Sequence, residues 1–144
     1  MTYSPTRRSP RGAGPAQAYA SIGLETKVLS ASPEQLITLL FDGAQAAIAK
    51  ARLYMQNGQI DGRGMAISKA IDIVDSGLKA SLDLETGGEL AKNLNATYDL
   101  VIRNLLLANL NVDMERLDLA DRLLATIGDA WRTNTSSRAE ILPV

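Results

Sequence analysis

The sequence predicts an all-α fold, an antiparallel up-down four-helix bundle with a short N-terminal capping segment. Four stretches of about 20 residues each repeat apolar side chains at helical spacing. One Trp, four Tyr and one Phe are the only aromatic residues, so aliphatic and alanine side chains must form the core. No strand-like alternation or hairpin signal competes with the helical pattern.

The first helix is expected over residues 33–57. Ser32 is a good N-cap, Pro33 suits the first helical position, and Gln35 completes a capping box. The turn signal Asn57-Gly58 ends the pattern. Its apolar stripe consists of Leu36, Leu40, Ala44, Ala47, Ala51 and Tyr54. The alanines of this stripe would let a neighbouring helix approach closely.

Three further helices are expected over residues 64–85, 89–111 and 113–132. Gly87-Gly88 separates the second from the third, and Asp113 is a plausible N-cap for the fourth. Each has its own apolar stripe: Ile67, Ala70, Ile71, Val74, Leu78 and Leu82; then Leu90, Leu94, Tyr98, Val101, Leu105 and Ala108; then Leu117, Ala120, Leu124, Ile127 and Trp131. Short polar loops between helices of similar length favour antiparallel neighbours.

The two ends of the chain differ in sequence pattern from the four predicted helices. Residues 1–15 contain three prolines, two glycines and three arginines, and we expect a disordered basic arm. Residues 16–29 are too short and too broken to hold a helix alone, and their apolar side chains Tyr19, Ile22 and Val28 would dock on the bundle. The folded domain is therefore expected over residues 16–132, with a flexible tail at 133–144.

Composition excludes several kinds of chemistry. The chain has no cysteine and no histidine, which removes thiolate nucleophiles, the usual zinc sites and haem ligation by histidine. The aspartates of the second and fourth helices fall mostly opposite the apolar stripes, as solvated side chains do. We therefore expect no enzyme, no metal and no cofactor.

Charge and hydropathy limit the classes of partner and the location that are expected for this protein. Three of the 15 basic residues lie in the arm, which leaves 12 against 16 acidic residues in the rest of the chain. An acidic body argues against nucleic acid as a partner. No apolar run is long enough to insert into a membrane, and no secretory signal opens the chain, so a cytoplasmic location is expected.

Apolar residues also lie outside the main stripes, where a bundle should be polar. On the second helix Ile73, Gly77, Ala80 and Leu84 follow 4-3-4 spacing, and on the third Ala96, Leu100 and Leu107 form a second line. Such lines suit a groove for a partner helix. Tighter burial and a homodimer seam explain the same pattern, and the residues alone leave these readings equally open.

An ordered set of short motifs resembles the flagellar secretion chaperone family, FliS, from about Ala18 to Arg132. The motifs are Ala18-Tyr19-Ala20, Ser30-Ala31-Ser32-Pro33, Gln35-Leu36-Ile37, Leu40-Phe41-Asp42-Gly43-Ala44, Ala51-Arg52-Leu53, Leu78-Lys79-Ala80, Leu82-Asp83, Gly87-Gly88-Glu89, Asn93-Leu94, Tyr98-Asp99, Arg103, Ala108-Asn109-Leu110, Asp113 and Asp129-Ala130-Trp131. The sequence departs from the family pattern at Leu100, Asn104 and Val112.

The resemblance implies a cytoplasmic chaperone of the bacterial flagellum. Proteins of this family bind the disordered C-terminal segment of flagellin, prevent its premature polymerisation, and present it to the export gate of flagellar type III secretion. The lines on the second and third helices would then be the client groove, and Tyr19, Ile22 and Val28 a removable cap. Other flagellar regulators are further candidate partners, and a self-associating structural bundle, a homodimer when free, is the alternative.

Overall fold

The computed structural model describes the backbone of residues 31–141 and the side chains of residues 31–135. In this part of the chain four helical stretches follow one another, as predicted, and the all-α fold class is confirmed. They are α3 (Pro33–Gln56), α4 (Ile60–Asp72) with its continuations η1 (Ile73–Leu78) and η2 (Lys79–Ser81), α5 (Gly88–Asn111) and α6 (Met114–Ile141). The predicted arm at 1–15 and the predicted cap, with Tyr19, Ile22 and Val28, lie outside the described residues.

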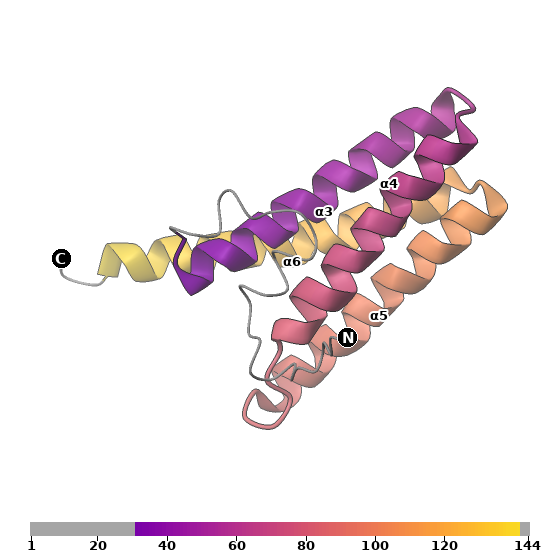
Figure 1. Cartoon of the computed structure of the whole chain (residues 1–144). Coiled ribbons are helices and arrows are strands. Elements are labelled where there is room, and N and C mark those ends of the chain that lie inside the picture. Colours follow the sequence, from indigo (N-terminus) through magenta and orange to yellow (C-terminus); the bar gives the residue numbers. More distant parts are fainter. Residues whose placement is uncertain (1–30, 142–144) are drawn as a thin grey trace, which may run out of the picture.

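Each helix packs beside the next, and α6 also packs against α3 (Figure 1). Polar contacts show the relative directions. Arg52 in the second half of α3 pairs with Asp118 near the start of α6. Arg63 near the start of α4 donates from Nε to Oδ1 of Asn109, near the end of α5, at 3.0 Å. In both pairs the start of one helix lies beside the end of the other, as in an antiparallel arrangement.

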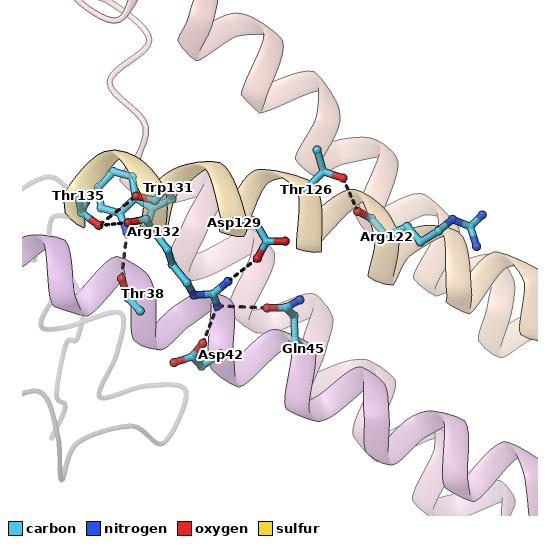
Figure 2. Close-up of polar contacts among 9 residues, drawn as sticks. All are labelled: Thr38, Asp42, Gln45, Arg122, Thr126, Asp129, Trp131, Arg132 and Thr135. Carbon is cyan, nitrogen blue, oxygen red and sulfur yellow. Dashed lines mark hydrogen bonds and ion pairs between the residues drawn. The ribbon is translucent and has the colours of Figure 1, made fainter. Parts of the chain in front are cut away.

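The other end of the α3–α6 contact is also fixed by side chains (Figure 2). Trp131 of α6 donates from its indole Nε1 to the hydroxyl of Thr38 at 3.0 Å. The guanidinium of Arg132 donates to Asp42 at 2.6 Å and to Gln45 at 3.3 Å. The region of α3 around Thr38 to Gln45 is therefore held against the second half of α6.

The core lies along the centre of the bundle and is almost entirely aliphatic. Small residues on α3 let its neighbours approach, because Ala44 and Ala51 have no exposed surface. The largest fully buried side chains come from all four helical stretches: Phe41, Leu40, Ile48, Ile67, Ile73, Leu78, Leu105, Leu117, Leu124, Val74 and Val101. At about 25 cal/mol per Å² of apolar surface, this burial is the main force holding the helices together.

The helix α3 begins where the sequence predicts. The Ser32 hydroxyl accepts from the backbone N–H of Gln35 at 3.1 Å, and the Gln35 side chain accepts from the backbone N–H of Ser32 at 2.8 Å. Both halves of the predicted capping box are therefore present. The helix ends at Gln56, one residue before the expected end.

The second helical stretch begins earlier than expected, at Ile60 rather than residue 64, and ends earlier, at Ser81 rather than 85. Gly62 lies inside the helix because the chain there passes close to α3. A Cβ atom at this position would come within 2.6 Å of the Tyr54 ring. The glycine that looks like a loop residue in the sequence is therefore a helix-packing residue.

The winding of this stretch also changes along its length. Residues 73–78 form a π-helix, and three residues of 3-10 helix follow. A π-turn carries more residues than an α-turn, so it shifts the following side chains around the axis. The π-segment contacts both α3 and α5.

The last helix is longer than expected. The sequence predicts a flexible tail from residue 133, but the backbone of α6 stays helical to Ile141. No glycine or proline interrupts the chain between Gly128 and Pro143. Thr135, inside the expected tail, donates its hydroxyl to the backbone oxygen of Trp131 at 3.0 Å, a bond within the helix. In Figure 1 the end of α6 extends past the start of α3.

Candidate functional site

Two of the seven residues predicted to line a groove lie in the core instead. Ile73 has no exposed surface, and Gly77 is buried. The reason is the position of the π-helix, which is covered by α3 and by α5 at once. Two sides of this segment are therefore buried, whereas the sequence pattern anticipates one. Ile73 and Gly77 are corrected from open groove residues to core residues.

The other five predicted residues lie at or near the surface. Ala80 follows the π-helix and is exposed, and Leu84 in the next turn has 48% of its surface exposed. On α5, Ala96 is exposed, Leu100 is 46% exposed and Leu107 is half-buried.

The α5 residues share one side of their helix. At ~100° per residue, positions 96, 100, 103, 107 and 110 cluster within a narrow arc. The core residues Val101, Leu105 and Ala108 project to the opposite side. We call the set Ala96, Leu100, Arg103, Leu107 and Leu110 the outer face of α5.

The sequence prediction missed two members of this face, Arg103 and Leu110. Leu110 is 76% exposed and follows Leu107 by three residues, the next position in the same repeat. Continuing the 4-3-4-3 spacing along the helix would have found it. The outer face therefore extends almost to the end of α5 at Asn111.

An ion pair joins this face to the preceding helical stretch. Lys79 Nζ lies 2.8 Å from Asp99 Oδ1, beside Leu100. The hydrogen bond to Asp99 raises the pKa of the Lys79 ammonium above its ordinary value. The contact brings Lys79, which precedes Ala80 in the chain, against the middle of α5.

A buried amide connects the outer face of α5 to α6. Asn104 is 1% exposed, the one polar side chain among the buried residues of the described structure. Its Nδ2 donates to the backbone oxygen of Leu100 at 2.9 Å, and its Oδ1 accepts from Arg116 of α6 at 3.1 Å. Both polar ends of the amide are satisfied, and the turn that carries Leu100 is tied to α6.

The outer face of α5 is mainly apolar. Across residues 31–135, no three acidic side chains gather where they could hold a metal ion. The helices of the described part include none that is long and apolar enough to cross a membrane. The chemistry that the outer face does offer is apolar contact along about four helical turns, with one cation at its centre.

Comparison with known proteins places this bundle in a family. The family model described as flagellar protein FliS matches residues 15–138. The flagellar secretion chaperone FliS of Salmonella typhimurium is 50% identical over 116 residues, which cover 81% of this chain and 86% of that protein. The FliS of Escherichia coli is 46% identical and covers 84% of this chain and 89% of its own length. The flagellar secretion chaperone FliSB of Pseudomonas aeruginosa is 40% identical, with 78% and 89% covered. The match covers most of the chain, and the all-α bundle agrees with the resemblance noted in its motifs. The chain therefore belongs to the FliS family of flagellar secretion chaperones.

Proposed function

We propose that this chain is a cytoplasmic, non-enzymatic export chaperone that binds the disordered C-terminal segment of flagellin. Binding prevents premature polymerisation and delivers the subunit to the export gate of the flagellar type III apparatus. Family membership supports the role. The observation that carries the binding mode is the outer face of α5, where leucines are exposed on a helix whose other side is already in the core.

The client contacts of this proposal are the surface residues of the predicted groove. They are Ala80, Leu84, Ala96, Leu100 and Leu107, with Leu110 added. A disordered segment that folds on binding must offset its own ordering entropy with a long apolar contact. Successive leucines along one helix supply such a contact, and an amphipathic helix is the client shape that fits it.

The N-terminal segment has a part in the same proposal. Tyr19, Ile22 and Val28 would cover some of these residues in the free protein and leave when the client arrives. A cover of this kind keeps exposed leucines away from wrong partners, and it lowers the apparent client affinity by the fraction of molecules that are closed.

Co-purification with flagellin tests the function. The full chain is mixed with full-length flagellin and, separately, with flagellin that lacks its C-terminal segment. Capture of the full-length form alone, as a one-to-one heterodimer by mass, is the expected result. Equal capture of both forms would move the site elsewhere on flagellin. If neither form is captured and the chain associates with itself, the self-associating bundle is the better account.

A matched pair of variants tests the location. Leu100→Asp places a charge on the outer face and should weaken flagellin binding roughly ten-fold or more, because an apolar contact is lost and a carboxylate is desolvated. Leu53→Asp makes the same change at a leucine of α3 that is 59% exposed, and should leave binding unchanged.

Both variants should keep the helical circular dichroism of the parent protein, since both leucines are largely outside the core. Isothermal titration gives the two affinities. An equal loss of binding in the two variants would show that α5 is not the docking helix. Unfolding of Leu100→Asp would show that Leu100 contributes to the core.

A further inference from the structure

The outer face of α5 has a cation at its centre. Arg103 is exposed and occupies the middle position of the series Ala96, Leu100, Arg103, Leu107, Leu110. Residues three and four apart are neighbours on a helix surface. The neighbours of Arg103 are therefore Leu100, Leu106 and Leu107, together with Asp99.

The one carboxylate among these neighbours is already engaged. Asp99 pairs with Lys79 at 2.8 Å. Within residues 31–135, the hydrogen bonds and ion pairs of the structure engage most of the other arginines but leave the guanidinium of Arg103 without a partner. Arg103 is thus a cation surrounded mainly by leucine, with no anion supplied by its own bundle.

This charge determines which helix can cover the face. A docked helix removes water from Arg103, and a buried charge without a partner is strongly unfavourable. A second copy of the chain docked through the same series does not provide the partner. Arg103 lies midway between Ala96 and Leu110, so pairing two copies of α5 through this series, parallel or antiparallel, sets Arg103 against Arg103. Like charges in contact oppose that pairing.

We propose that Arg103 recognises a carboxylate on the client, and that this ion pair sets the register of the docked helix. The inference rests on the proposed function and specifies the chemistry of the partner. The client helix has apolar residues at a and d positions over about four turns, roughly 21 Å, with one Asp or Glu among them facing Arg103. An arginine suits this task because its planar fork binds a carboxylate through two parallel hydrogen bonds.

A double-mutant cycle tests the ion pair. Arg103→Gln shortens the side chain, keeps a polar group at its end and removes its charge. Its affinity for full-length flagellin should fall roughly thirty-fold or more, a typical loss when one member of a covered charge pair is truncated. Each acidic residue of the flagellin C-terminal segment is then changed to its amide. One of these changes should weaken binding to the parent chaperone and have no further effect on Arg103→Gln.

Arg122→Gln on α6 is the matched control. Arg122 is also exposed, and among residues 31–135 its guanidinium has no hydrogen bond or ion pair, while its backbone oxygen accepts from the Thr126 hydroxyl at 2.9 Å. This variant should bind flagellin like the parent. The thermal unfolding of both arginine variants should match the parent, because neither guanidinium holds the bundle together.

The outcomes separate this inference from the proposed function. If Leu100→Asp loses binding while Arg103→Gln does not, the docking face stands and the carboxylate pair is overturned. The pair is also overturned if no acidic residue of flagellin couples to Arg103, or if the free chain forms a dimer that Leu100→Asp dissociates. If the parent chain does not bind flagellin at all, the proposed function itself fails.

Discussion

Gly77 is a residue at which the second helical stretch lies close to α3. A Cβ atom there would lie 2.8 Å from Cδ2 and 3.0 Å from Cδ1 of Leu40, which has no exposed surface and little room to move. Gly77→Ala should therefore destabilise the protein by about 1 kcal/mol, because overpacking of ~1–3 kcal/mol exceeds the helical gain from alanine of ~1 kcal/mol. Urea unfolding measures the difference.

Gly64 provides the matched control for this prediction. It lies inside α4, and a Cβ atom there would meet nothing within 4 Å. Gly64→Ala should stabilise the protein by about 0.5–1 kcal/mol, since it gains helix propensity without a clash. If the two variants change the unfolding free energy in the same direction, the packing argument at Gly77 is wrong.

For single residues, the sequence predicted which side chains lie outside the main apolar stripe. It did not predict whether neighbouring helices then cover them. Its helical wheel set Leu100 apart from the core stripe, and 46% of that residue is exposed. The same wheel set Ile73 apart, yet Ile73 is fully buried. The difference comes from how many neighbours each segment has, and one helix considered alone does not contain that information. Asn104 was missed because a buried amide looks like any polar residue until its two partners are known.

At the scale of the element, the sequence predicted helix starts better than helix winding. The start of α3 was predictable because a capping box is a local arrangement of four consecutive residues. The π-helix at Ile73–Leu78 was not, because it depends on contacts with α3 and α5. The end of α6 was placed too early because Ser, Thr and Asn lower helix propensity only slightly, and the chain lacks a glycine or proline there.

The end of α5 departs from the usual preference for glycine or asparagine at a left-handed helix end. Val112 closes this helix with a φ of 51°, the left-handed region that glycine or asparagine usually occupies. A β-branched residue there costs roughly 1–3 kcal/mol. The strain sits immediately after the outer face of α5, and it is offset by the turn it allows, in which Asp113 accepts from the backbone N–H of Glu115 at 3.0 Å to start α6.

For the whole molecule, the fold was predictable and the client surface was not fully so. Four apolar stripes separated by short loops have few ways to bury themselves other than as a closed bundle. A binding surface is defined by what remains after that burial. Its members are known only once the bundle has covered Ile73 and Gly77 and left Leu110 and Arg103 outside.

Buried Tyr98 links the ionisation of one phenol to the stability of the whole bundle. It is 4% exposed, and burial raises its pKa to about 12, from an ordinary value near ~10. The folded state thus disfavours the phenolate. The resulting stability is fully present below pH ~10 and is lost as the pH rises to ~12. Two pKa units correspond to roughly 2–3 kcal/mol of unfolding free energy.

Tyr98→Phe should remove this contribution, because phenylalanine fills the same space and has no proton to lose. Urea unfolding at pH 8, 10 and 11.5 would compare the two proteins. The parent should lose more stability than the variant above pH ~10, while other titrating groups cancel in the difference. Parallel stability curves for the two proteins across this range would mean that the phenol ionises as easily in the folded bundle as in the unfolded chain, and that water reaches Tyr98 in the core.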